Sequence, residues 1–358
     1  MGSIAALEEA KASGFNPMVS VILSRQGSSY SVNADEEEKA SLCIVRRAGF
    51  LSPTREHTHH LRQKLSALCA VRMATQDLYL FFHGLPLPKI VHSEESLEDF
   101  RKFKVQNDDI FVISYPKSGT TWMQEIIPLL LNGGDLTPVE SIPNWERVPW
   151  LEETRAVLFL DKLSAPRTMV SHMPYPLMPP TFSSSKAKAI YIARNPKDVL
   201  VSSFYFHQMA SFLDDPGTFE EFMDKFLAGQ VLFGKWTDHV KSWRNTDLGD
   251  RIFYITYEEL IQDLRGALER MLRFLGRQMS EEALDRVTEH CLFKNMKKNN
   301  MSNYSLVPQE VMDSSKSHFL RKGIAGDWKN HFSPELEDKF NAVIQKELEG
   351  SGINFPWD

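Results

Sequence analysis

Cysteine is scarce in this 358-residue sequence, and long hydrophobic runs are missing. The three cysteines, Cys43, Cys69 and Cys291, are far apart and odd in number, which argues against a disulfide framework and predicts a reducing, cytoplasmic location. No apolar run is long enough to span a bilayer and no signal peptide is recognisable, so we expect no membrane partner. A net charge of −6 argues against an extended nucleic-acid interface.

Two parts of the chain differ in composition. Residues 1–72 carry an acidic cluster and small polar runs, which predict an atypical, disordered N-terminal extension. His57, His59 and His60 lie in it, but no Cys or further His stands at ligand spacing, so we expect no metal site. Residues 73–358 have the mixed apolar and charged composition of one folded domain.

Short apolar segments alternate with helical patterns from residue 78 onward. We expect strands at residues 110–115, 167–172, 189–193 and 252–256. We expect helices at residues 122–131, 199–209, 218–235, 258–275 and from 281, and a last helix that begins at Ser333 and Pro334. The alternation predicts an α/β fold of three layers, in which helices flank a central parallel β-sheet.

The segment from Ile110 to Trp122 combines a strand, a turn of small residues and a helix N-terminus. Pro116 ends the strand, because proline cannot donate to a sheet ladder. The N–H groups of residues 117–121 and the helix dipole would face an anion, and Lys117 adds a full charge. The pattern predicts a phosphate or sulfate site, although an ordinary βα turn also carries Gly, Ser and Thr. It is not a Walker A loop, since its lysine precedes the glycine.

Further cations stand where a parallel sheet gathers its ligand site. Arg194 follows a predicted strand, and Arg321 and Lys322 lie in a glycine-bearing loop. His172 comes just past another strand and is a candidate general base, although a lone histidine is more often structural. Together these residues predict a nucleotide-like ligand with more than one anionic group. They leave open whether phosphoryl or sulfuryl transfer follows.

Aromatic residues supply candidate apolar walls. Trp122 and Phe293 are candidates to clamp a purine ring. Trp145 and Trp150 lie in a stiff loop with two prolines, residues 142–150. Such a loop suits the wall of an apolar pocket, but both tryptophans are equally compatible with plain core packing.

Residues 115–122 and 321–330 resemble the two hallmark motifs of the cytosolic sulfotransferases. Segments between them follow in the order of that family: 194–202, 255–260 and 293–304. The likeness is closest to the hydroxysteroid branch, which carries Ser-Ser-His where this chain has Val170, Ser171 and His172, whereas phenol-directed members carry Lys-Thr-His. Ser171 and His172 fit that branch, and Val170 departs from it.

The resemblance implies a P-loop-nucleotide-binding-like fold and the donor 3′-phosphoadenosine 5′-phosphosulfate (PAPS). It implies transfer of the sulfuryl group to a steroid, sterol or related alcohol, with adenosine 3′,5′-bisphosphate as product. His172 would take the acceptor proton and Lys117 would stabilise the leaving group. The implied donor-binding residues are Lys117, Ser118, Gly119, Thr120, Thr121, Trp122, Arg194, Ser202, Tyr257, Cys291, Leu292, Phe293, Lys294, Asn295, Met296, Phe319, Leu320, Arg321, Lys322 and Gly323. The implied acceptor-binding residues are Val170, Ser171, Trp145, Trp150, Phe204, Phe206 and Tyr304.

Three alternatives remain: a phenol-directed sulfotransferase, a small-molecule kinase and an inactive nucleotide-binding protein. No metal is expected, because sulfuryl transfer carries less charge than phosphoryl transfer and fixed cations with N–H groups suffice. The dimer motif of the resembled family is altered between Lys329 and Asp338 at three of its four fixed positions, so a homodimer is only weakly indicated.

Overall fold

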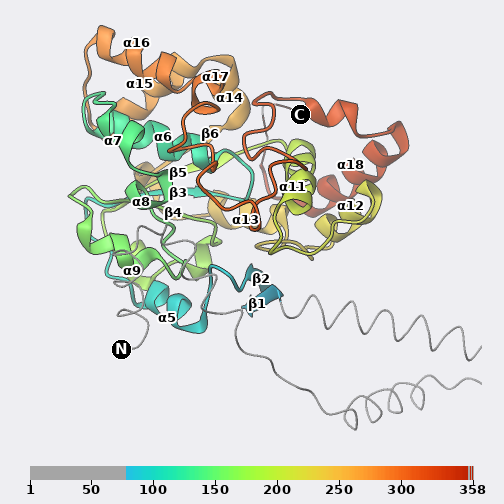
Figure 1. Ribbon diagram of the computed structural model, residues 1–358. Coiled ribbons are helices and arrows are strands. Elements are labelled where there is room, and N and C mark those ends of the chain that lie inside the picture. Colours follow the sequence, from blue (N-terminus) through green and yellow to red (C-terminus); the bar gives the residue numbers. More distant parts are fainter. Residues whose placement is uncertain (1–77, 354, 356, 358) are drawn as a thin grey trace, which may run out of the picture. The chain divides into compact units, whose positions relative to one another are not determined.

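The computed structural model describes residues 78–353, 355 and 357 (Figure 1). The folded unit that it describes begins at Leu78. The expectations for residues 1–72, including His57, His59 and His60, lie outside the described residues, and the boundary at residue 72 stays a prediction. Within the described part, no helix combines the length and apolar character that crossing a membrane requires.

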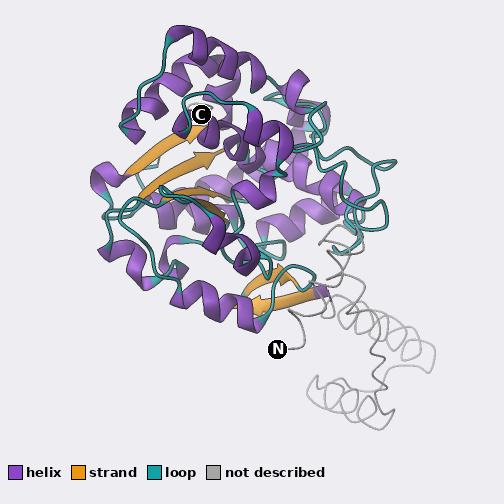
Figure 2. Ribbon diagram, turned by 60° about the vertical axis from the view of Figure 1, so that its left-hand side comes forward, coloured by secondary structure: helices purple, strands orange, loops and turns teal. Residues whose placement is uncertain are grey.

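A parallel four-stranded sheet forms the centre of the fold, in the order β4-β3-β5-β6. Its strands are β3 (Ile110–Ser114), β4 (Thr168–Ser171), β5 (Lys188–Ala193) and β6 (Ile252–Thr256). Every residue of β3 and β4 is buried, as a parallel sheet covered on both faces requires. The predicted α/β fold with a central parallel sheet is confirmed, and Figure 2 shows helices around the strands.

Helices cover both faces of the sheet. They are α5 (Glu94–Lys102), α6 (Thr120–Leu131), α7 (Thr137–Ser141), α8 (Asn144–Arg147), α9 (Ala156–Phe159), α10 (Pro180–Ser184), α11 (Pro196–Met209), α12 (Phe219–Leu227), α13 (Trp236–Arg244), α14 (Tyr257–Gln262), α15 (Leu264–Leu275), α16 (Glu281–His290), α17 (Phe293–Met296) and α18 (Pro334–Leu348). Short 3₁₀ turns are η1 (Leu160–Lys162), η2 (Tyr175–Leu177), η3 (Gly249–Arg251) and η4 (Asp327–Asn330).

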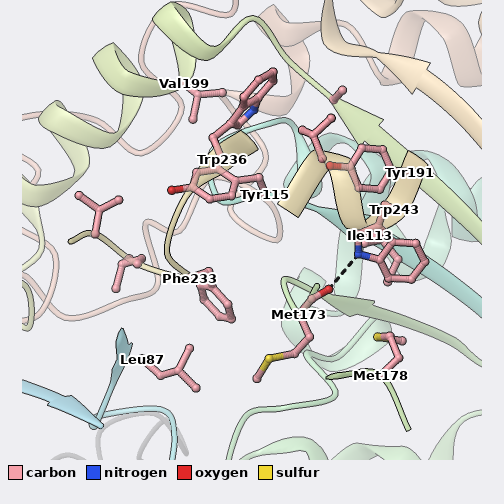
Figure 3. Close-up of a cluster of buried hydrophobic side chains, with 14 of the residues drawn as sticks. Leu87, Ile113, Tyr115, Met173, Met178, Tyr191, Val199, Phe233, Trp236 and Trp243 are labelled. Atoms are coloured by element: carbon pink, nitrogen blue, oxygen red, sulfur yellow. Dashed lines mark hydrogen bonds between the residues drawn. The ribbon is translucent and has the colours of Figure 1, made fainter. Parts of the chain in front are cut away.

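Alternate residues of β3 belong to two separate hydrophobic clusters, one on each face of the sheet. Val112 belongs to the cluster formed with α6, α14, α15 and α16, whereas Ile113 belongs to the cluster formed with α11, α12, α13 and α18. This follows from the two-residue period of a strand. Figure 3 shows part of the second cluster, where Trp243 donates through Nε1 to the carbonyl of Met173 at 3.0 Å.

A hairpin that the sequence analysis did not predict precedes the sheet. β1 (Tyr79–Phe82) pairs antiparallel with β2 (Leu85–Pro88) through a two-residue turn, in which His83 and Gly84 both have positive φ. Positive φ at both turn residues matches the right-handed twist of a hairpin. β2 contains two prolines, and its one partner among the described strands is β1. Proline is tolerated in such an edge strand because the N–H groups on its open side have no strand to bond to.

Two helix predictions were wrong in their extent. Residues 258–275 form two helices, because the Asp263 carboxylate accepts from Gly266 N at 2.9 Å and starts α15 as its N-cap. Residues 229–235 lie outside any helix, since α12 ends at Leu227. The capping box of Thr218 with Glu221 and the start of the last helix at Ser333 and Pro334 are confirmed.

A buried carboxylate ties α6 to its neighbours. Glu125 is fully buried, and it accepts from Arg147 Nη2 at 2.5 Å, His290 Nε2 at 2.7 Å and Asn299 Nδ2 at 3.1 Å. It also contacts the Ser302 hydroxyl. These partners come from α8, α16 and the segment after α17, so one charge fixes the helix that follows the predicted anion loop.

We expect Glu125→Ala to lower the free energy of unfolding by about 3–5 kcal/mol, because Arg147 is left as a buried charge without its carboxylate. Urea denaturation measures the loss. Glu98→Ala is the matched control, since its ion pair with Lys102 is exposed and surface pairs contribute little. Equal losses in the two variants would contradict the assigned role of burial.

Candidate functional site

The turn between β3 and α6 requires glycine at its centre. Gly119 has φ +115°, and a Cβ there would lie 2.8 Å from Ile192 Cδ1 and 3.1 Å from Tyr257 Cδ2. Gly119 is the N-cap of α6, and no side chain caps that helix end. The first N–H groups of α6 therefore remain available to a ligand. Ser118 adds a buried hydroxyl that has no hydrogen-bond partner among the described residues.

Arg194 carries a buried charge beside this turn. Its guanidinium donates to the carbonyls of Lys117 at 3.1 Å and Ile324 at 3.3 Å, and it lies 4.2 Å from the Tyr257 ring centroid. Its Nε is buried without a hydrogen-bond partner among the described residues, and Glu258 acts on it only through longer-range attraction, without an ion pair. A buried cation without an acid is costly, so the site fits an anionic ligand.

Lys117 is enclosed by two aromatic rings. Its Nζ lies 4.1 Å from the centroids of both Phe206 and Phe319. Burial, and then the positive charges of Arg194 and Arg321, lower the pKa of Lys117 to about 7. An anion bound nearby would favour the charged ammonium and raise this pKa again.

The loop cations Arg321 and Lys322 are paired with an acid that the sequence analysis missed. Asp327 accepts from Arg321 at 2.7 Å and from Lys322 at 2.6 Å, and together with Asn330 they hold its pKa well below the usual range although burial opposes this. Asp198 of α11 accepts from the N–H groups of Gly326 at 2.6 Å and Trp328 at 2.9 Å. The carboxylates thus hold the loop beside the N-terminus of α11.

The two residues predicted to clamp a purine, Trp122 and Phe293, each pack against other parts of the site. Trp122 donates through Nε1 to the carbonyl of Cys291 at 2.8 Å and packs edge-on against Tyr257 at 5.3 Å. Phe293 lies directly on Gly323, where a Cβ would come within 2.1 Å of the ring. The backbone carbonyl of Cys291, and not its thiol, thus holds Trp122. Any side chain at residue 323 would collide with the Phe293 ring.

The other predicted donor-binding residues lie in more ordinary surroundings. Lys294 and Asn295 both contact Glu289, and Lys294 is exposed. Thr120, Thr121 and Met296 are buried, Ser202 is half-buried, and Leu292 and Leu320 pack on the cluster that contains Val112.

His172 is oriented by the start of the same turn. Its Nδ1 lies 2.5 Å from the carbonyl of Ser114, so Nδ1 carries the proton and Nε2 keeps a free lone pair. Burial lowers the pKa of His172 to about 3, with His92 and Lys117 contributing in the same direction. The imidazole is therefore neutral at pH 7 and can accept a proton.

Two rings and two backbone contacts hold His172 in place. Trp150 and Phe233 lie 4.5 and 5.1 Å from the imidazole centroid. The His172 N–H donates to Glu152 Oε1 at 2.8 Å, and its carbonyl accepts from His239 Nε2 at 3.1 Å. Phe233, Glu152 and His239 were not predicted, because nothing in their local sequence places them beside residue 172.

Four of the seven predicted acceptor residues, Trp145, Trp150, Phe206 and Tyr304, contact one another, Lys117 or His172. Trp145 packs on Tyr304 at 5.3 Å, Tyr304 on Phe319 at 4.0 Å, and Phe319 on Phe206 at 5.9 Å, so a line of rings ends at Lys117. Trp150 contacts the imidazole of His172 and also hydrogen-bonds to Tyr304, so it connects this line to His172.

Three predicted acceptor residues do not join these rings. Phe204 packs against Phe219 at 5.4 Å, because two residues of separation turn it to another side of α11 from Phe206. Val170 is fully buried in the cluster that contains Val112, and the Ser171 hydroxyl accepts from Met173 N at 3.0 Å.

No group of three or more metal-ligating side chains occurs within residues 78–353. The groups that the site offers to a ligand are its cations, the unpaired N–H and hydroxyl groups of the turn and the neutral imidazole of His172.

Comparison with known proteins gives concordant matches. A family model described as the sulfotransferase domain matches residues 107–352. The chain is 46% identical to Sulfotransferase 2B1 of Mus musculus, over 78% of this chain and 83% of that protein. It is 40% identical to the 3-beta-hydroxysteroid sulfotransferase of Cavia porcellus, over 79% of this chain and 99% of that protein.

Two solved structures share the fold. Retinol dehydratase in complex with androsterone and the inactive cofactor PAP has a TM-score of 0.65 and 25% identity, over 77% of this chain and 90% of that chain. Mouse sulfotransferase SULT7A1 complexed with PAP has a TM-score of 0.65 and 28% identity, over 77% of this chain and 96% of that chain.

We expect Arg194→Met to raise the pKa of Lys117, because a positive neighbour that disfavours the ammonium is removed. Burial remains, so the pKa should stay below that of an exposed lysine. NMR titration of the Lys117 side chain measures the change. Arg101→Met, at the exposed end of α5, should leave it unaltered, and a fall after Arg194→Met would contradict the assigned charge effect.

Proposed function

The chain belongs to the sulfotransferase family, and from that premise we propose that it transfers the sulfuryl group of PAPS to the hydroxyl of a steroid, sterol or related alcohol. One observation carries this proposal. The turn from Ser114 to Lys117 binds the imidazole of His172 at its first carbonyl and the guanidinium of Arg194 at its last. A proton acceptor and an anion-binding cation are therefore fixed to the same four residues.

The residues present fit an anionic nucleotide donor. The unpaired Ser118 hydroxyl, the uncapped start of α6 and the unpaired Arg194 Nε are polar groups that await an anion. We assign residues 117–122 to the 5′-phosphosulfate, and Arg194, Ser202 and residues 321–323 to the 3′-phosphate. When bound, PAPS supplies the sulfuryl group and leaves as adenosine 3′,5′-bisphosphate.

The chemistry assigned to this chain needs two side chains. The Nε2 lone pair of His172 accepts the proton of the acceptor hydroxyl as its oxygen attacks, because an alcohol is a poor nucleophile until that proton leaves. The ammonium of Lys117 meets the negative charge on the departing bridge oxygen. Lys117 belongs to the turn and His172 is bonded to it through Ser114, so the assigned base and counter-charge share one support.

A hydroxysteroid acceptor is favoured by two comparisons and by the aromatic line. One relative is named a 3-beta-hydroxysteroid sulfotransferase, and one structural neighbour holds androsterone together with PAP. Trp145, Tyr304 and Phe206 offer apolar faces next to Lys117. Sulfotransferase 1A1 of Bos taurus is also 40% identical, so identity alone does not favour the relative named for hydroxysteroids. A phenol-directed enzyme remains the second candidate. The homodimer and the cytoplasmic location stay predictions.

We expect purified protein to transfer labelled sulfuryl from PAPS to a sterol alcohol, and His172→Ala to lower kcat by about 10²-fold or more through loss of the base. Lys117→Ala should lower kcat as well. Lys102→Ala is the matched control, because that lysine is exposed on α5.

Each other result of this assay has a distinct meaning. Undiminished transfer in both active-site variants would contradict the mechanism. A preference for phenols would favour the phenol-directed alternative. PAPS binding without transfer to any acceptor would identify an inactive nucleotide-binding protein.

We expect Gly119→Ala to weaken binding of adenosine 3′,5′-bisphosphate at least tenfold, because the new Cβ displaces the anion loop from Ile192. Gly133→Ala is the matched control. Its φ is also positive, but nothing lies within 4 Å of the added Cβ. Gly133→Ala should lose about 1–2 kcal/mol of stability from the left-handed backbone, and Gly119→Ala should lose more because its Cβ also meets Ile192. Calorimetric titration measures affinity, and equal affinity in the two variants would contradict the proposed cradle.

A further inference from the structure

Glu152 is a buried acid that the proposed mechanism leaves unused. It lies just after a segment that pairs with β4, where Val170 N donates to Pro149 O at 2.9 Å and Leu151 N donates to Val170 O at 3.0 Å. Its side chain is 1% exposed. Oε1 accepts the His172 N–H at 2.8 Å, and Oε2 has no hydrogen-bond partner among the described residues.

The Glu152 carboxyl accepts the first backbone N–H beyond the end of the β3–β4 ladder, that of His172. β3 pairs with β4 only as far as Ile113 opposite Ser171, so the His172 N–H lies beyond the last pair. The Ser171 hydroxyl also bonds to Glu152, while it accepts from Met173 N at 3.0 Å. One carboxyl and one hydroxyl therefore fix three consecutive residues, with the proposed base in the middle.

The same segment also contacts the imidazole directly. Trp150, two residues before Glu152, packs on the His172 ring at 4.5 Å. Ser96 of α5 fixes the backbone of the same segment, since its hydroxyl donates to the Glu152 carbonyl at 3.1 Å. The backbone and ring of His172 thus depend on one short stretch of chain.

A neutral side chain would satisfy the His172 N–H at a lower desolvation cost. A buried carboxyl with one unpartnered oxygen is expensive, and such groups call for an explanation beyond packing. We infer that Glu152 is a positioning residue for His172, which holds the backbone at residues 171–173 so that the Nε2 lone pair faces the acceptor hydroxyl. This inference rests on the proposed function.

The protonation state of Glu152 gives the inference a measurable signature. Burial raises the pKa of Glu152 to about 7, while its hydrogen bonds oppose the shift and the charge of Glu153 adds to it. The titratable groups that act on it are Glu153 on its own segment and His172, which follows β4 directly and donates its backbone N–H. Above pH 7 the carboxylate accepts both hydrogen bonds at full strength, and below pH 7 protonation weakens them.

The experiment compares E152Q, which keeps the shape and one acceptor oxygen, with E152A, which removes both contacts. E153Q is the matched control, because it removes a neighbouring carboxylate that pairs with Arg155. We expect E152A to lower kcat by about 10²-fold, the scale of a small misplacement of a reacting group. The KM for PAPS and the affinity for adenosine 3′,5′-bisphosphate should change less than about twofold, since no donor contact is lost.

The pH profile separates positioning from mere stability. Wild-type kcat should fall as pH drops through 7, whereas E152Q should have a lower kcat that no longer changes there. A loss of nucleotide affinity at unchanged kcat, or a wild-type pH profile in E152Q, would overturn the inference.

An NMR measurement tests the inference without requiring turnover. In the wild type and E153Q, the ¹⁵N shifts of His172 should show one tautomer with the proton on Nδ1. E152A should show a mixture of tautomers, because the bond to Ser114 is no longer held in register. Retention of the single tautomer in E152A would overturn the inference, whereas absent transfer with the expected NMR change would overturn only the proposed function.

Discussion

Positive charge held at the β3–α6 turn, with no ion pair to Arg194 or Lys117 among the described residues, is the constraint on which the site depends. Arg194 is buried and donates to two backbone carbonyls, while Lys117 lies between two aromatic rings. Neither arrangement supplies an ion pair, and burial of Lys117 lowers its pKa to about 7, so both groups favour an anionic ligand. In contrast, Asp327 pairs both Arg321 and Lys322 in the neighbouring loop. An anionic donor would therefore meet two unpaired cations first and compete with a carboxylate for the other two.

The imidazole of His172, which is neutral although cations lie nearby, is held by the same turn. Ser114 accepts the Nδ1 proton of His172, and the rings of Trp150 and Phe233 keep the imidazole out of water. Burial and the nearby Lys117 both disfavour the imidazolium. The imidazole is therefore neutral at pH 7 with its Nε2 lone pair free, and a bound anion would favour the imidazolium that forms when it takes a proton. Glu152 is the nearby acid that keeps this neutral base in register.

Several features were predictable because they depend on neighbours in sequence. The run of β-branched residues before Pro116, the small residues after it and the N-cap of the last helix are local patterns, and they predicted β3, the turn to α6 and the start of α18. Local patterns failed where a side chain overrode periodicity. Asp263 interrupted an apolar stripe by capping a new helix, and the prolines of β2 hid an edge strand.

By itself the sequence determined the alternation of strands and helices, the motif at residues 115–122 and the family resemblance, because each is written in contiguous residues. Only the tertiary structure decided which groups meet. It turned Phe206 toward Lys117 and Phe204 away from it, set the tautomer of His172 through Ser114, and brought Glu152 to the end of β4. The physical reason is that pKa values, tautomers and ring contacts depend on burial and on partners distant in the chain.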